Sequence, residues 1–234
     1  MMHSDQTPFR TGWWAADLGE TRPCESTYCF SDYAALPPLD TTLLDGEFAW
    51  LPALDERTDR MMAVHREQRS KKLRQRLDTL TAQAAQLGLT LPPAFVRFMA
   101  SPVLQDRVPS CTACYYDLPE KIVKSTASDD GYFLRFLNDQ QDVLLWFLYL
   151  DTKGNHCVVV SDLMYDDEAG FKQWAEGSQY SMSELTVGHT FFCAPDFESC
   201  VYRFWIENTI WFALNEGVGA LDDSQRKYIE HYRK

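Results

Sequence analysis

Two cysteines separated by two residues, Cys111 and Cys114, are the residues of this chain best suited to chemistry. A Cys-x-x-Cys pair exchanges disulfides when a helix N-terminus lowers the pKa of one thiol, yet Pro109 precedes this pair and an apolar stretch follows it. The pair also supplies half of a zinc site if two more ligands join it, and Cys24 and Cys29 are of the right type. A third interpretation is two free thiols at the start of a strand. The spacing alone leaves all three interpretations open.

Carboxylates form a second candidate site, in three short groups within predicted loops. They are Asp129, Asp130, Asp139, Asp142, Asp166, Asp167 and Glu168. Paired carboxylates act as acid and base or bind a metal ion only when they are buried and converge, and no EF-hand spacing is present. Most such groups are solvated turn residues. We expect these seven to be the first contacts of a basic partner.

Known catalytic and cofactor motifs are missing from the sequence. The five histidines form no His-Glu-x-x-His pair, and no nucleophile elbow, P-loop or dinucleotide-binding motif occurs. We therefore expect no catalytic residues and no cofactor.

The charge of the chain is strongly negative but unevenly spread. The formal net charge is −12, whereas residues 57–76 carry eight basic and two acidic side chains, a local charge of +6. An acidic protein repels nucleic acid and attracts basic partners. The basic segment is interpreted as a solvated helix face, a nucleic-acid patch or a partner-binding helix, and its lack of aromatic residues disfavours nucleic acid.

The cysteine count and the first residues indicate a compartment. Seven scattered cysteines do not form an even, closely spaced disulfide framework, so reduced thiols are expected. The first eight residues have neither the basic nor the apolar region of a secretory signal, and no apolar run is long enough to span a membrane. We predict a cytoplasmic protein without membrane contact.

Three consecutive apolar segments predict the centre of the fold. Residues 132–137, 143–150 and 156–160 are separated by short polar loops, so they should form an antiparallel meander, with Gly154 at positive φ in the second loop. The middle segment does not alternate between apolar and polar residues. It should therefore be covered on both faces, with helices packed over the sheet.

Further elements surround this meander. Apolar spacing predicts a helix within residues 59–87 that ends at Gly88, and a Pro-Pro start predicts a short helix over residues 92–99. Asp196 should cap a long closing helix. Residues 115–118 and 190–193 are expected to be strands, a final amphipathic piece spans residues 222–232, and residues 165–183 are expected to be a long loop with one helical turn.

The first 54 residues are rich in aromatics and turn formers and have no sustained periodicity. We expect an irregular extension wrapped on the rest of the chain, because so many large apolar groups rarely stay solvated. The predicted organisation is an N-terminal extension over residues 1–56 and an α+β domain over residues 57–234, in which a helix precedes an antiparallel meander sheet covered by helices.

The order of these elements resembles the SUKH superfamily, also called the Smi1/Knr4 family. The matching pieces are the Leu-Pro-Pro-x-Phe-x-x-Phe helix start at residues 91–98, the strand block 131–160 with Trp146 in its central strand, and the Asp-Phe-Glu helix start at residues 196–198. The resemblance covers residues 91–215. This chain departs from the family at Ala100-Ser101-Pro102, where members commonly have an Asn-Gly turn.

The resemblance implies an α+β domain without catalysis of its own. Bacterial members are largely immunity proteins that bind and neutralise a toxin, often a nuclease or deaminase, and fungal members act as regulatory scaffolds. The leading prediction is therefore a non-enzymatic immunity protein that binds a basic toxin stoichiometrically and does not bind nucleic acid directly. The alternatives are a small zinc or thiol-dependent protein built on Cys111 and Cys114, and a regulatory scaffold of the Smi1/Knr4 type.

Overall fold

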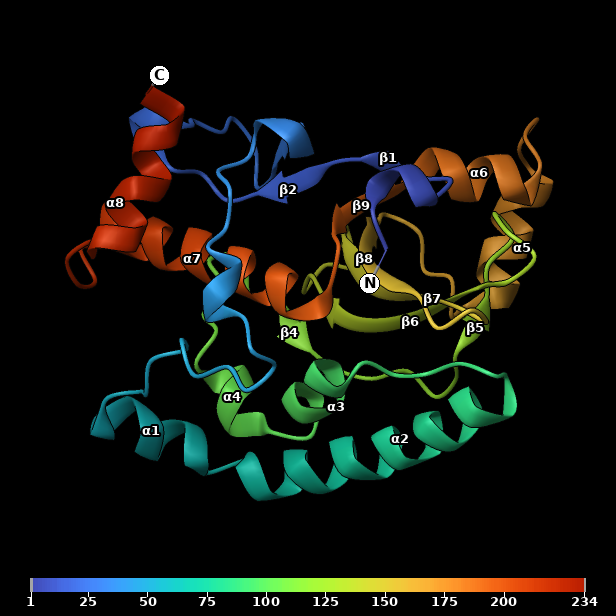
Figure 1. The fold of residues 1–234 in the computed structure, drawn as a ribbon, viewed down its shortest axis with the longest axis horizontal. Helices are drawn as coiled ribbons and strands as arrows, with labels where there is room; N and C mark the ends of the chain where they lie inside the picture. The colour runs from blue at the N-terminus through green and yellow to red at the C-terminus, as the bar shows by residue number, and fades with distance from the viewer. Residues whose placement is uncertain (1, 234) are drawn as a thin grey trace.

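A mixed seven-stranded sheet with helices packed on both faces forms the centre of the computed structural model, which describes residues 2–233 (Figure 1). The strand order is β1-β9-β8-β7-β6-β4, and β5 also pairs with β6. In the described residues the helices are α1 (Glu56–Ala63), α2 (Arg66–Gln86), α3 (Pro93–Met99), α4 (Pro102–Asp106), α5 (Glu168–Glu176), α6 (Met182–His189), α7 (Phe197–Asn215) and α8 (Asp223–Glu230). The strands of this sheet are β1 (Arg10–Thr11), β4 (Tyr115–Tyr116), β5 (Val123–Lys124), β6 (Gly131–Asn138), β7 (Leu145–Asp151), β8 (His156–Ser161) and β9 (Thr190–Ala194). The chain is thus an α+β protein, as predicted.

The predicted meander is confirmed as β6, β7 and β8, which pair antiparallel in sequence order. Every residue of β7 is buried, which explains why its sequence does not alternate. Trp146 and Leu148 face one hydrophobic core, and Leu145 and Phe147, which alternate with them along the strand, face the other. Gly154 has a φ of 84° in the β7–β8 turn, as its position predicts.

The larger core lies under α2, α3 and α7. Leu73, Leu77 and Leu80 of α2 are buried in it, as their spacing predicts, and Gly88 follows the helix with a φ of 71°. Phe95 of α3 packs on Phe197 of α7, with ring centroids 5.1 Å apart. The predicted helix over residues 59–87 is divided in two, because α1 ends before α2 begins at Arg66.

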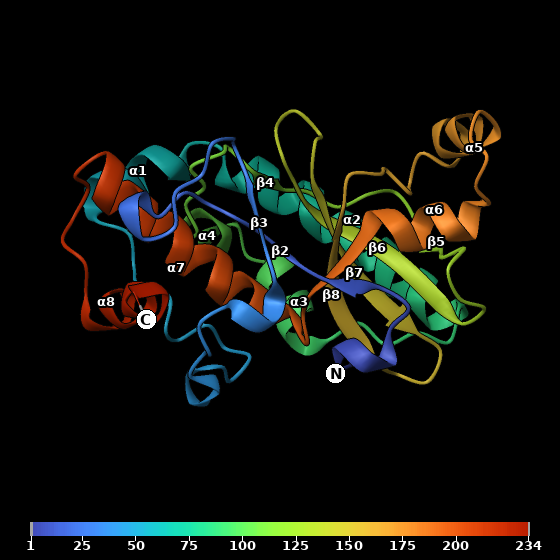
Figure 2. The ribbon, with the colours of Figure 1, turned by 90° about the horizontal axis from the view of Figure 1, so that it is seen from above.

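The smaller core lies on the opposite face of the sheet, under α5 and α6. These two helices lie at the opposite end of the molecule from α1 and α8 (Figure 2). The prediction of a long loop over residues 165–183 is wrong, because α5 and the start of α6 lie there. Both helices are short and bury few apolar residues, so apolar periodicity in the sequence does not reveal them. Their N-terminal caps determine where they begin: Asp167 accepts from the amide of Gly170, and Ser181 forms a capping box with Glu184.

The remaining strand and helix predictions are confirmed with shifted bounds. The predicted edge strand at residues 115–118 is limited to β4, which pairs with the end of β6, and β9 covers the strand predicted at residues 190–193. Asp196 caps α7 by accepting from the amide of Ser199 at 2.8 Å. No helix within residues 2–233 is both long enough and apolar enough to cross a membrane.

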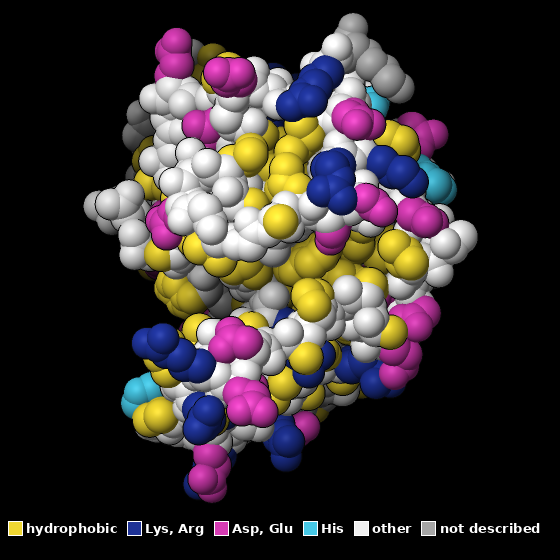
Figure 3. Space-filling view, turned by 90° about the vertical axis from the view of Figure 1, so that its left-hand side faces the viewer, with side chains coloured by type: hydrophobic (Ala, Val, Ile, Leu, Met, Phe, Trp, Pro, Cys, Tyr) yellow, Lys and Arg dark blue, Asp and Glu magenta, His cyan; other side chains and the backbone are white. Residues whose placement is uncertain are grey.

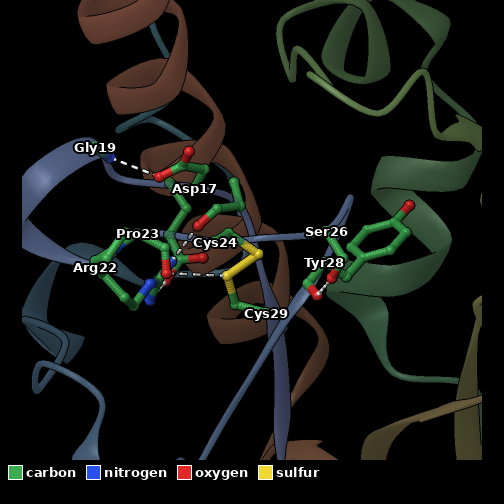
Figure 4. Close-up of a disulfide and its surroundings, with 10 residues drawn as sticks. Asp17, Gly19, Arg22, Pro23, Cys24, Ser26, Tyr28 and Cys29 are labelled. Atoms are coloured by element: carbon green, nitrogen blue, oxygen red, sulfur yellow. Dashed lines mark hydrogen bonds and ion pairs between the residues drawn. A yellow bond between two sulfur atoms is a disulfide. The ribbon is translucent and has the colours of Figure 1, made fainter.

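The N-terminal extension, predicted over residues 1–56 and described here from residue 2 to the start of α1 at Glu56, is not wholly irregular. It contributes β1, which pairs in parallel with β9 and makes the sheet mixed, and a separate two-stranded sheet of β2 (Trp13–Ala15) and β3 (Cys29–Ser31). A disulfide joins Cys24 to Cys29 (Figure 4), so the expectation that all the cysteines are reduced is wrong for this pair. The five other cysteines are free.

Buried charges on α7 hold the extension in place. Glu207 accepts from the indole of Trp13 at 2.9 Å and pairs with Arg22 at 2.8 Å. The carboxylate of Glu198 accepts in the same way from the indole of Trp50 at 2.8 Å. Arg203, also buried, donates to the carbonyl of Pro37 at 3.0 Å. Because an unpaired buried charge is costly, these partners fix the path of the extension across α7.

Candidate functional site

A hollow of about 500 Å³ beside β9 is the first candidate site, and we call it the Tyr28 groove. It is lined by Trp14, Ser26, Thr27, Tyr28, Val143, Leu144, Asp162, Gly188, His189 and Phe191. These residues come from the N-terminal extension, the β6–β7 loop, the residue after β8, the end of α6 and β9. A pocket of this size, mostly apolar with a few polar groups, is typical of binding sites.

Tyr28 is held firmly in the wall of this groove. Its hydroxyl donates to the carboxylate of Asp139 and lies 3.0 Å from the Thr112 hydroxyl and 3.4 Å from the Cys114 sulfur. Burial, followed by the neighbouring Cys114 and the hydrogen bond to Asp139, raises the pKa of Tyr28 well above its ordinary value. The phenol therefore stays neutral, and the adjacent Cys24–Cys29 disulfide further restricts the loop that carries it (Figure 4).

His189 and Asp162 form the most polar part of the groove. The imidazole Nδ1 lies 2.9 and 3.1 Å from the two carboxylate oxygens of Asp162, and Trp174 packs edge-on against the ring at 5.3 Å between centroids. A carboxylate that orients an imidazole is one part of a catalytic triad. Among the described residues, however, the imidazole has hydrogen bonds only to Asp162, so no nucleophile is aligned with it.

Exposed hydrophobic side chains surround the groove. Phe30, Val143 and Trp174 are 52%, 48% and 45% exposed. Phe30 packs on Phe191, with ring centroids 5.5 Å apart, so the aromatic surface continues out of the groove. A contiguous exposed apolar surface beside a groove is typical of an interaction site.

The structure brings only two of the seven predicted acidic residues to the Tyr28 groove. Asp139 is buried and accepts from Tyr28, and Asp142 is exposed and directly precedes Val143. Asp129 and Asp130 lie before β6, at its other end, where Asp130 pairs with Lys153 at 2.6 Å. The two loop groups are therefore separated by the length of a strand.

The third acidic group is engaged within the chain. Asp166 pairs with Arg135 at 2.6 Å, Glu168 pairs with Lys121 at 2.7 Å, and Asp167 caps α5. These three residues lie just before and at the start of α5, and none of them lines the groove. The seven carboxylates thus do not form one surface.

The structure places Cys111 and Cys114 as partly buried free thiols in the loop before β4. Burial and the neighbouring Cys114 raise the pKa of Cys111 to about 12, and burial also raises the pKa of Cys114. Because the thiolate is the reactive form, both are poor nucleophiles. Cys24 and Cys29 are bonded to each other, and within residues 2–233 no three His, Cys, Asp or Glu side chains converge to hold a metal ion.

Most of the groove could not be identified from the sequence. Trp14, Tyr28, Asp162, His189 and Phe191 come from four distant segments and follow no common spacing. The available signal was compositional: an N-terminal segment dense in aromatics must cover apolar surface somewhere.

Comparisons with known proteins identify no relative of this chain. No protein-family model, curated protein or solved structure matches this chain. The resemblance to SUKH domains therefore stays a prediction from the sequence, and the function is inferred from the geometry of the Tyr28 groove.

Proposed function

We propose that this chain is a non-enzymatic protein-binding domain that holds its partner at the Tyr28 groove. The main observation behind the proposal is that aromatic side chains line the groove and that exposed Phe30, Val143 and Trp174 extend this apolar surface at its edge. Aromatic side chains dominate the energetics of protein interfaces, because they bury a large area at a small cost in conformational entropy.

The rigidity of the groove supports stoichiometric binding. Tyr28 is fixed by Asp139, Thr112 and the neighbouring disulfide, so little conformational entropy is lost when a partner binds. A volume of about 500 Å³ accommodates one or two large apolar side chains of a partner.

The charge around the groove favours a basic partner. Asp162 lines the groove, and exposed Asp142 and Glu25 are adjacent in sequence to the lining residues Val143 and Ser26. Arg10 and His189 are the opposing groups, and Arg10 is already stacked over Phe191 at 5.2 Å. With a net charge of −12, the whole chain attracts a cationic protein and raises its rate of association.

Within this proposal, the most specific role is that of a cytoplasmic immunity protein of the SUKH type. Its partner is a basic toxin of the nuclease or deaminase type, bound directly without nucleic acid or membrane. The sequence resemblance and the acidic rim support this role. The thiol-dependent alternative has less support, because the pKa values of Cys111 and Cys114 are raised rather than lowered.

The test begins with a partner isolated from the native organism by the tagged chain and identified by mass spectrometry. The recombinant partner is then titrated calorimetrically against the wild type, against Val143→Asp and against the control Val218→Asp. Val218 is also exposed but lies beyond the end of α7, away from the groove.

We expect one-to-one binding that Val143→Asp weakens by at least about tenfold, or ~1.4 kcal/mol, and that Val218→Asp leaves unchanged. If no partner binds stoichiometrically, or if both variants bind within about twofold of the wild type, the proposal is wrong.

A further inference from the structure

Helix α1 exposes its hydrophobic side chains to solvent. Met61 and Met62 are 62% and 41% exposed, Val64 at its C-terminal end is 73% exposed, and no residue of α1 is buried. An isolated helix of eight residues is not stable in water. Here Asp55 caps the first turn and Asp59 pairs with Arg66 at 2.7 Å, so polar contacts hold a helix whose apolar side chains have no cover.

A second hollow, of about 710 Å³, lies beside this helix, and we call it the α1 groove. Its lining includes Leu54 and Met62 on the α1 side, Val108 and Tyr115 from the loop after α4 and from β4, and Trp205 from α7. Figure 3 views the molecule from the side that carries α1 and α8 and shows hydrophobic side chains gathered in the hollow between them. Met62 belongs both to the groove lining and to the exposed apolar side chains of α1, so the groove and the helix share an apolar edge.

The charge near the α1 groove is opposite to that of the whole protein. Arg69, Lys72 and Arg107 line it against the two carboxylates of Asp106 and Asp117, and Arg57 is exposed on α1, outside the lining. Arg69 pairs with Asp106, and Lys72 pairs with Asp117 at 3.0 Å. Arg107 of the lining and Arg57 on α1 have no ion-pair partner among residues 2–233, so one unpaired positive charge lies in the groove and a second lies on the adjoining helix.

We propose that the α1 groove binds a helical segment of a second protein, with an apolar stripe facing the groove and acidic residues along its edges. A concave surface of this volume fits a helix, whereas a flat bilayer would leave it empty. Exposed methionines suit such a site, because their flexible side chains adapt to the partner. The unpaired Arg57 and Arg107 select acidic flanks.

This inference is independent of the proposed function, since it uses a different surface. The two linings have no residue in common, and they approach each other only where Tyr28 of one groove contacts Cys114 of the other at 3.4 Å; Val143 and Met62 each belong to one groove alone. A variant in one groove therefore serves as the control for the other.

Three probes test the proposal at 150 mM salt, where the Debye length of about 8 Å limits repulsion by distant acidic residues. The first is an 18-residue helical peptide with a leucine stripe and glutamate flanks. The second has the same stripe with lysine flanks. The third is a vesicle with phosphatidylcholine and phosphatidylserine in a ratio of seven to three.

Binding is followed by fluorescence anisotropy and by NMR of ¹³C-labelled methionine methyl groups. We expect the glutamate peptide to bind at least tenfold more tightly than the lysine peptide, and to shift the signals of Met61 and Met62 but not that of buried Met99. Met62→Asp should weaken this binding at least tenfold, and Val143→Asp should leave it unchanged. Circular dichroism verifies that both variants are folded.

Three results would each overturn the inference. The lysine peptide could bind as tightly as the glutamate peptide, or neither could bind at millimolar concentration. The protein could also bind the vesicles through Met61 and Met62 while ignoring the glutamate peptide, which would make α1 a membrane contact.

Discussion

Replacing Arg22 by methionine should destabilise this protein by about 3–5 kcal/mol, the usual cost of removing one partner of a buried ion pair. Glu207 is only 1% exposed, and its carboxylate accepts from Arg22 at 2.8 Å, from Trp13 at 2.9 Å and from Tyr228 at 2.6 Å. Arg22→Met leaves the two neutral donors but removes the cation. The carboxylate then stays buried without a directly bonded cation, and only the more distant Arg203 compensates part of its charge.

The pH dependence of this loss has a defined sign. In the wild type, Arg22 and the hydrogen bonds outweigh burial and lower the pKa of Glu207, so its stabilising contribution is present above the ordinary glutamate pKa and is lost as pH falls through the folded value. Without Arg22, burial dominates and raises the pKa of Glu207. The cost of Arg22→Met should therefore be largest near pH 7 and should shrink on acidification, as the buried carboxyl takes up a proton.

Urea unfolding followed by circular dichroism at pH 7 and pH 5 measures both effects. For a domain of this size the loss corresponds to a fall in Tm of about 6–20 °C. Arg226→Met is the control, because the Arg226–Asp223 pair is exposed to solvent and should contribute little to stability. The double variant Arg22→Met with Glu207→Gln should lose less stability than the sum of the losses of the two single variants, by at least about 2 kcal/mol. A loss below about 1 kcal/mol for Arg22→Met, or strict additivity in the double variant, would refute the reasoning.

Two further predictions follow from the thiol loop and from the sheet. With a pKa of about 12, Cys111 should react with iodoacetamide at pH 8 roughly thirtyfold or more slowly than glutathione, since the smaller thiolate fraction outweighs its greater nucleophilicity. Peptide mapping measures this rate, and a rate equal to that of glutathione contradicts the burial argument. Gly131→Ala should cost about 1–3 kcal/mol, because the added methyl group overlaps the hydroxyls of Tyr149 and Ser128. Gly188→Ala, whose new methyl group meets nothing within 4 Å, is the matched control, and equal unfolding midpoints for the two variants would show that the sheet adjusts freely.

The centre of the fold was predictable because its signals are local. An apolar run with no alternation, such as residues 145–150, has few solutions other than a strand covered on both faces. Leu73, Leu77 and Leu80 likewise define a helix face without reference to the rest of the chain. Helices α5 and α6 were missed for the opposite reason. They bury so few apolar residues that capping and tertiary contact, rather than periodicity, determine them.

The candidate site was not predictable, because it depends on contacts between distant segments. The seven acidic residues stand out in the sequence, yet most of them are engaged in local pairs or caps, and only Asp142 lies exposed beside the Tyr28 groove. The more informative residues were Glu198 and Glu207, two carboxylates on the buried part of a largely apolar helix. Buried carboxylates require donors, and the indoles of Trp13 and Trp50 supply them from the N-terminal extension.

The bonds from Glu198 and Glu207 to the N-terminal extension also affect both grooves, because the extension lines each of them. Trp14 and Tyr28 of the extension line the Tyr28 groove, and Leu54 near its end lines the α1 groove. Glu207 fixes the extension next to Trp14, by accepting from Trp13. The Arg22→Met substitution should therefore weaken binding at the Tyr28 groove even under conditions where the domain stays folded. Binding at the α1 groove should be less affected, because Glu198 and Trp50 hold that part of the extension separately.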